Sequence, residues 1–132
     1  MQHTLCAYNI TRRSFLGLSV HRADTFFTRL RGLLGRTRLD GDDGMWVVPS
    51  KGIHSIGVLF AVDLVYLDAD EKVVHTIENF RPFRIAPLKI KAQTVLELPL
   101  RTIYSSRTQT GDQIRVCSPE QLKSNWNAPS RM

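Results

Sequence analysis

The chain has little cysteine and no cysteine motif. Cys6 and Cys117 are its two cysteines, near opposite ends, with neither the C-x-x-C spacing of a metal or redox site nor the density of a disulfide-stapled domain. A bridge would require the first and last strands to be neighbours in one sheet, and the sequence favours two reduced, half-buried thiols over a bridge. A disulfide scaffold is therefore excluded, and whether these two thiols are bridged stays open.

Long apolar runs are also missing. The longest, residues 56–62, ends at Asp63, far short of the roughly 20 apolar residues that a membrane-spanning helix needs. The first five residues lack the charged segment followed by an apolar one that marks a secretory signal. We therefore expect a cytoplasmic protein without a membrane span.

The motifs of the common nucleotide-binding and nucleophile enzymes are absent. There is no G-x-x-x-x-G-K-[ST] or G-x-G-x-x-G phosphate loop and no G-x-S-x-G elbow. The acidic turns at 40–43 and 68–70 lack the glycine and glutamate of a calcium-binding EF-hand loop, and the histidines show no i, i+4 pairing. We predict no metal site and no cofactor.

The composition is that of an ordinary globular protein with excess positive charge. The 132 residues are 42% hydrophobic and 23% charged, with a formal net charge of +6, which fits one domain with a real core. The positive excess lies in residues 1–43 and 79–117, whereas 44–78 is acidic. A basic balance favours anionic partners, although it bears on association and not on fold.

Short strand patterns separated by turn residues recur along the chain. The one convincing helix covers about residues 24–35, and a short second helical turn is expected at 101–107. Many strands with one good helix predict a mainly β, compact antiparallel sandwich or barrel-like domain over 1–117, followed by a polar C-terminal tail over 118–132. The expected strands are 5–10, 15–20, 45–48, 52–56, 58–67, 72–77, an edge-like strand at 89–91, 94–98 and 113–117.

Six short stretches, taken in order, carry a family resemblance. They are Arg31-Gly32-Leu33-Leu34, Gly44-Met45, Ile53-His54-Ser55-Ile56-Gly57, Asp63-Leu64-Val65-Tyr66-Leu67-Asp68, Val95-Leu96-Glu97-Leu98-Pro99 and Gly111-Asp112. Their order and spacing resemble an uncharacterised prokaryotic family, domain of unknown function 192, over most of the chain. The resemblance implies a compact, mainly β fold and says almost nothing about activity.

Two carboxylates are expected to lie within strands. Asp63 and Glu97 each share a strand face with apolar residues, so each needs a hydrogen-bond donor or must stay protonated. Arg31 on the helix and His54 upstream of the long strand could supply donors. If the four converge they form a ligand site or an acid–base or metal-assisted centre; otherwise Asp63 accepts backbone N–H groups and Glu97 pairs with an arginine.

A second candidate site is the basic stretch 80–91. Arg81 and Arg84 alternate with phenylalanines, and Lys89 and Lys91 follow, a pattern that can stack bases and contact phosphates. The same pattern is also typical of a solvated basic loop. Nucleic acid is not favoured as a partner, because no known recognition signature accompanies these residues.

Three functions are compatible with the sequence. We favour a noncatalytic β-domain that binds a small ligand or a protein partner around Arg31, His54, Asp63 and Glu97. The alternatives are an acid–base or metal-assisted hydrolase that uses His54, Asp63 and Glu97, and an anion or nucleic-acid binder that uses 80–91. A homodimer through exposed edge strands is also compatible with the pattern.

Overall fold

The computed structural model describes residues 4–23, 39, 41–52, 60–82 and 84–126. The helix expected at 24–35 lies outside these residues, and so does most of the strand expected at 52–56. Within the described part, the chain forms seven strands and two helices. The fold is therefore mainly β, as the sequence predicts.

The N-terminal hairpin is confirmed. β1 (Leu5–Asn9) and β2 (Ser14–Ala23) pair antiparallel, and the turn between them holds Arg13 at a φ of 56°. On its other side β1 pairs antiparallel with β7 (Ile114–Cys117). Strands from near the two ends of the chain are thus neighbours in the sheet.

One strand pair departs from the expected antiparallel arrangement. β3 (Asp43–Val47) runs parallel to β2, and on its other side it pairs antiparallel with β6 (Thr94–Leu98). A parallel neighbour needs a crossover of about a dozen residues or more, whereas a tight turn joins antiparallel strands. The long stretch between β2 and β3 supplies that length.

The hairpin after β3 is also confirmed. β4 (Val62–Leu67) and β5 (Val73–Phe80) pair antiparallel, and β4 begins later than the expected 58–67 strand. All six residues of β4 are buried, because β5 and β6 flank it and side chains cover both of its faces. This explains why the β4 sequence is apolar at nearly every position.

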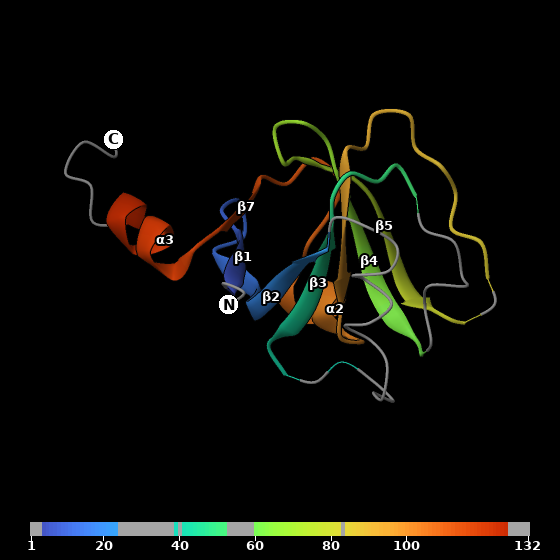
Figure 1. Ribbon diagram of the computed structural model, residues 1–132, viewed down its shortest axis with the longest axis horizontal. Helices are drawn as coiled ribbons and strands as arrows, with labels where there is room; N and C mark the ends of the chain where they lie inside the picture. The colour runs from blue at the N-terminus through green and yellow to red at the C-terminus, as the bar shows by residue number, and fades with distance from the viewer. Residues whose placement is uncertain (1–3, 24–38, 40, 53–59, 83, 127–132) are drawn as a thin grey trace.

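The strands form one curled sheet, a half-barrel, in the order β5-β4-β6-β3-β2-β1-β7 (Figure 1). At one end the two outermost strands approach each other. Lys72 forms an isolated antiparallel bridge with Gln113, and the amide of Val73 donates to the carbonyl of Asp112 at 2.9 Å. This contact shields part of both sheet edges.

The sheet has a hydrophobic cluster on each face. One cluster includes Val65, Leu67, Leu96 and Leu98 and reaches strands at both ends of the sheet. The other contains Val62, Leu64, Tyr66, Phe80 and Val95 from the sheet, together with Phe60, Ala86 and Ala92 from flanking segments. The chain between β5 and β6 therefore covers one sheet face.

The residues expected to form an edge-like strand at 89–91 do not form one. The amide of Lys89 donates to the carbonyl oxygen of Lys51. The amide of Ala92 donates to the carbonyl oxygen of Lys89 and closes a turn. On this irregular loop Ile90 and Lys91 are exposed, whereas Lys89 is half-buried. Strand alternation alone does not supply the neighbouring strand that a ladder requires.

Two short helices complete the described chain. α2 (Thr102–Ser106) confirms the expected helical turn, and α3 (Pro119–Trp126) lies in the segment expected to be a polar tail. Ser118 and Gln121 cap α3 reciprocally: Ser118 Oγ accepts from the Gln121 amide at 3.1 Å, and Gln121 Oε1 accepts from the Ser118 amide at 3.0 Å. Neither of these two helices is long and apolar enough to cross a membrane.

Candidate functional site

Asp63 is buried and both of its carboxylate oxygens accept backbone hydrogen bonds. Oδ1 accepts from the amide of Asn79 and Oδ2 accepts from the amide of Ile103, each at 3.0 Å, and the residue is 1% exposed. Asn79 stands near the end of β5 with a φ of 57°, and Ile103 is in the first turn of α2. Asp63 therefore ties a strand end and a helix start to β4.

Glu97 faces the other side of the sheet. In the pairing of β4 with β6, Leu64 lies opposite Glu97, whereas Asp63 lies opposite Leu98. Opposed residues share a face and successive residues alternate, so the two carboxylates point to opposite faces. Glu97 is fully buried and takes part in an interaction of its own. The structure does not bring Asp63 and Glu97 together.

The other two members of that predicted site, Arg31 and His54, lie outside the described residues. Across the described part of the chain, no group of three or more histidine, cysteine, aspartate or glutamate side chains is placed to hold a metal ion. The described residues therefore offer no preassembled metal centre.

The basic stretch is brought together only in part. Arg81 and Arg84 line a common hollow, whereas Lys91 is exposed on the turn before β6 and Lys89 is half-buried. The positive charge of Lys89 reaches His75 on β5: burial first, and then this charge, lowers the pKa of that histidine. Two of the four cations thus line the hollow, and the other two do not.

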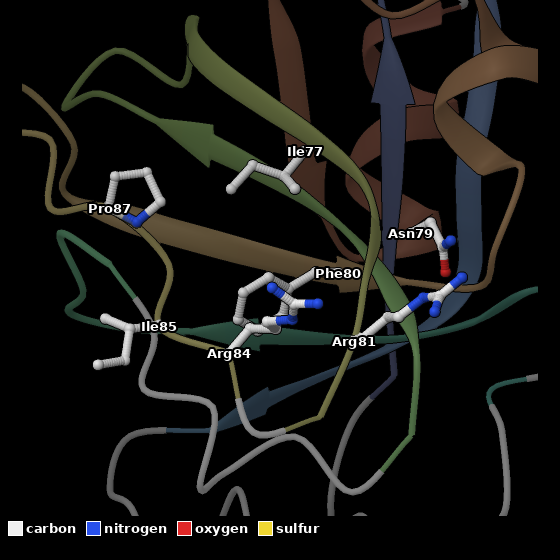
Figure 2. A pocket seen from close by; sticks show the side chains of 7 residues that line it. All are labelled: Ile77, Asn79, Phe80, Arg81, Arg84, Ile85 and Pro87. Atoms are coloured by element: carbon white, nitrogen blue, oxygen red, sulfur yellow. The ribbon is translucent and has the colours of Figure 1, made fainter.

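The hollow is an open depression of about 370 Å³ beside β5. Figure 2 shows Arg81 and Asn79 towards one end of it and Ile85 and Pro87 towards the other. Its lining, which we call the Arg81/Arg84 hollow, consists of Ile77, Asn79, Phe80, Arg81, Arg84, Ile85 and Pro87. Phe80 belongs to the hydrophobic core and Ile77 packs against it, so part of the lining is apolar and fixed.

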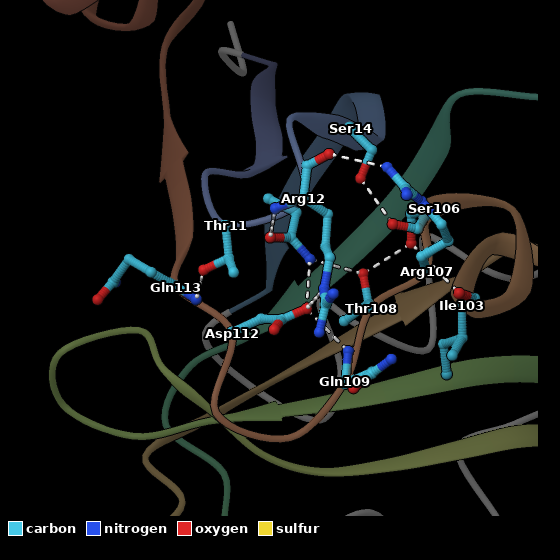
Figure 3. A network of polar contacts seen from close by, with 11 residues as sticks. Thr11, Arg12, Ser14, Ile103, Ser106, Arg107, Thr108, Gln109, Asp112 and Gln113 are labelled. Atoms are coloured by element: carbon cyan, nitrogen blue, oxygen red, sulfur yellow. Dashed lines mark hydrogen bonds and ion pairs between the residues drawn. The ribbon is translucent and has the colours of Figure 1, made fainter.

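A polar network that sequence reasoning missed joins the β1–β2 turn to the segment before β7 (Figure 3). Asp112 Oδ2 accepts from Asn9 Nδ2 at 3.0 Å, from Arg12 Nε at 3.1 Å and from the Gln109 amide at 2.9 Å. Asn9 Nδ2 also donates to Thr108 Oγ1 at 3.0 Å. The one sequence signal was the Gly111-Asp112 pair, which by itself indicates only a turn.

The network holds Asp112 in its charged form. Burial by itself would raise the pKa of Asp112, but the hydrogen bonds from Asn9, Arg12 and the Gln109 amide, together with the charge of Arg12, hold it below the ordinary value. The donors around Oδ2 are protein groups that also join two segments. Asp112 is therefore a structural carboxylate.

Comparisons with known proteins agree with this fold. A UPF0127 protein of Thermococcus sibiricus is 31% identical over 97 residues, which are 70% of this chain but only 62% of that protein's own length. A crystal structure of a protein of unknown function from Novosphingobium aromaticivorans has a TM-score of 0.68 at 18% identity, covering 84% of this chain and 82% of its own. A Sinorhizobium meliloti structure, described as that of a candidate transcription regulator, has a TM-score of 0.69 at 18% identity, covering 88% and 96%.

The structural neighbours show the fold alone at this level of identity, whereas a sequence-family match shows descent. The family model of DUF192, described as uncharacterised ACR proteins, matches residues 9–116. That range runs from the end of β1 into β7 and so contains nearly the whole sheet. The chain therefore belongs to the DUF192 family.

Proposed function

We propose that this protein is a noncatalytic ligand-binding β-domain whose site is the Arg81/Arg84 hollow, and that the ligand is an anion that carries an apolar group. One observation carries the proposal. Arg81 and Arg84 are exposed beside a partly apolar depression, and in the described chain no acceptor is hydrogen-bonded or ion-paired to either guanidinium.

The two arginines favour a carboxylate or phosphate as the anionic group. A guanidinium carries its donors in a planar fork that matches two oxygens of such an anion, and the charge-assisted bonds are stronger than neutral ones. Asn79 stands beside Arg81 in the same lining and adds an amide that can donate or accept. Oxygen-rich anions therefore fit this end of the hollow.

The remaining lining favours an apolar body on the same ligand. Ile77, Phe80, Ile85 and Pro87 present aliphatic and aromatic surface next to the guanidiniums. A volume of about 370 Å³ lies within the range of small-molecule sites, which are lined mainly by apolar groups and oriented by a few polar ones. A purely inorganic anion would leave this surface uncovered.

The acid–base alternative has less support from the described residues. Catalysis by paired carboxylates requires both to reach one substrate, and Asp63 and Glu97 face opposite sides of the sheet. Both oxygens of Asp63 already accept backbone hydrogen bonds. The geometry therefore favours binding over hydrolysis.

Titration with hexyl phosphate tests the proposal, with binding measured by calorimetry and by NMR signals of the lining residues. We expect hexyl phosphate to shift the signals of Ile77, Phe80 and Ile85. Inorganic phosphate and 1-hexanol should each bind much more weakly, because phosphate lacks the apolar chain and hexanol lacks the anionic group. Arg84→Glu should weaken binding by about tenfold or more, since it replaces a charge-assisted donor by a carboxylate that repels the anionic ligand.

Lys123→Glu on α3 is the matched control, because it changes the net charge equally and Figure 1 places α3 at the opposite end of the molecule from β5. Equal weakening by both variants, or the absence of any shift at the lining residues, would refute the proposal. Tighter binding of a DNA duplex, with steep salt dependence and loss in Arg84→Glu, would instead favour nucleic-acid binding. The Sinorhizobium protein's description makes that comparison worth including.

A further inference from the structure

The chain between β5 and β6 exposes three large aliphatic side chains within a short stretch. Ile85 is 78%, Leu88 76% and Ile90 87% exposed, and we call these three residues the aliphatic prongs. Apart from Tyr104, no other large hydrophobic residue of the described chain is more than 46% exposed. Such a concentration of exposed apolar surface is characteristic of an interaction site.

The prongs project from a loop that the rest of the domain holds in place. Ala86 and Ala92, at two positions along this loop, are buried in the core. Tyr66 Oη donates to the carbonyl oxygen of Pro87 at 2.8 Å, and Lys51 Nζ donates to that of Ala92 at 3.0 Å. The exposed side chains are therefore presented by an ordered backbone, which lowers the entropic cost of binding through them.

The surroundings of the prongs carry one sign of charge. No aspartate or glutamate occurs between Glu78 and Glu97, whereas four cations do: Arg81, Arg84, Lys89 and Lys91. Arg84 and Lys91 are exposed and immediately flank the stretch that bears the prongs. The partner of this surface must therefore combine negative charge with an apolar interior.

We propose that the loop docks on a membrane surface that contains anionic phospholipids. Ile85, Leu88 and Ile90 insert at the boundary between headgroups and acyl chains, and Arg84 and Lys91 contact the lipid phosphates. The inference goes beyond the proposed ligand site, because Leu88, Ile90 and Lys91 do not line the Arg81/Arg84 hollow.

The aliphatic character of the exposed prongs favours a bilayer over a protein partner. A stable protein interface buries about 800 Å² on each side and is centred on large anchors such as aromatic residues, whereas all three prongs are aliphatic. A bilayer accepts each apolar side chain individually and offers phosphates to every cation beside it. The alternation of isoleucine and lysine at 89–91 suits this geometry.

Co-sedimentation with vesicles tests the inference on the full chain. We expect the protein to bind vesicles made from equal parts of phosphatidylglycerol and phosphatidylcholine, and to bind pure phosphatidylcholine vesicles much less. Added salt should weaken binding, because it screens the lipid charge. The double variant Leu88→Ser/Ile90→Ser should lose about tenfold or more in vesicle affinity, since it removes two inserted side chains.

Tyr104→Ser is the matched control, because Tyr104 is an exposed large side chain on α2, outside the loop. It should bind mixed vesicles as the wild type does. Circular dichroism would establish that each variant is folded, and the double variant should still bind hexyl phosphate, which separates this inference from the ligand site.

Three results would overturn the inference. One is no binding to the mixed vesicles. Another is binding that the double variant retains in full. The third is a wild-type dimer, measured by light scattering, that the double variant converts to a monomer, because the prongs would then form an interface between two copies of the chain.

Discussion

At the scale of single residues, buried carboxylates hold segments of this domain together. Asp63 accepts hydrogen bonds from the amides of Asn79 and Ile103, and Asp112 accepts hydrogen bonds from the side chains of Asn9 and Arg12. In each case the partners come from segments distant in sequence. Such a carboxylate is costly to leave unpaired in the interior, so its replacement should destabilise the fold more than most surface changes do.

Asp112→Asn tests this role at the polar network. The variant keeps the shape of the side chain but loses the charge that accepts hydrogen bonds from three donors. We expect the free energy of unfolding at neutral pH to fall by about 1–3 kcal/mol. Urea denaturation measures the change, and Asp70→Asn, on an exposed turn residue, should have almost no effect.

The difference in unfolding free energy between the wild type and Asp112→Asn should depend on pH in a defined direction. Because the pKa of Asp112 is held below its ordinary value of 3.8, its charged form stabilises the fold above that pH, and this contribution is lost as the pH falls towards the lowered pKa. The difference between wild type and variant should therefore shrink below pH 3.8. A difference that stays constant through this range would contradict the assignment.

At the scale of elements, the pairing of β1 with β7 places the two cysteines opposite each other. Cys6 is the direct cross-strand partner of Cys117, and both thiols are buried and free. Opposed residues of an antiparallel pair have Cα atoms about 4.5–5.5 Å apart, which lies within the range that a disulfide spans. The strand register therefore answers the question of proximity that the sequence left open.

Diamide oxidation of the folded protein tests this register. The two thiols should lose two electrons and two protons to diamide, which is reduced to the hydrazine, and form one intramolecular disulfide. Burial, and then the charges of Cys117 and Glu120, raise the pKa of Cys6, so the reaction should be slow at neutral pH and faster in alkali. Intact-mass analysis measures the loss of two hydrogens.

Cys6→Ser provides the control for the disulfide, because it should show no intramolecular link. If the wild-type disulfide forms only after denaturation, even in alkali, the two strands do not hold the thiols as neighbours.

At the scale of the whole molecule, the half-barrel is joined at one end where the chain before β5 meets the chain before β7. Glu71, which has a φ of 63°, accepts two hydrogen bonds from β7. Its carbonyl oxygen accepts from the amide of Ile114 at 2.9 Å, and its side-chain Oε1 accepts from the amide of Val116 at 3.1 Å. Burial raises the pKa of this carboxyl, although the Val116 hydrogen bond and the charge of Arg115 oppose the shift. A neutral acceptor would therefore suit the position better.

Glu71→Gln should accordingly stabilise the protein at neutral pH. The amide oxygen can still accept from Val116, and the variant avoids burying a charge. Since a raised pKa means that the folded state favours the protonated acid, the gain should be present well above the folded pKa and vanish as the pH falls to 4.5 and below. Thermal unfolding of wild type and variant at neutral pH and at pH 4.5 measures this gain in stability. A variant less stable than wild type at neutral pH would show that the charged form of Glu71 is needed.

Much of the local structure was predictable, because side-chain alternation and turn residues act over short distances. The hairpins β1–β2 and β4–β5, strand β6 and helix α2 lie where the sequence predicts them, except that β4 begins later than expected. Helix α3 was missed because its apolar pattern is weak, although Ser118 and Gln121 carried a capping signal. The backbone acceptance by Asp63 was one of the two alternatives that its sequence context allowed.

The sequence by itself determined the fold class, the positions of most strands and the identity of the cations in the β5–β6 loop, because these depend on residue type and local spacing. Only the tertiary structure decided that β2 and β3 are parallel, that Asp63 and Glu97 face apart and that Cys6 meets Cys117. It also showed that Arg81 and Arg84 share a hollow with core residues. Alternation fixes the faces within one strand, whereas strand order and register depend on contacts between segments far apart in sequence.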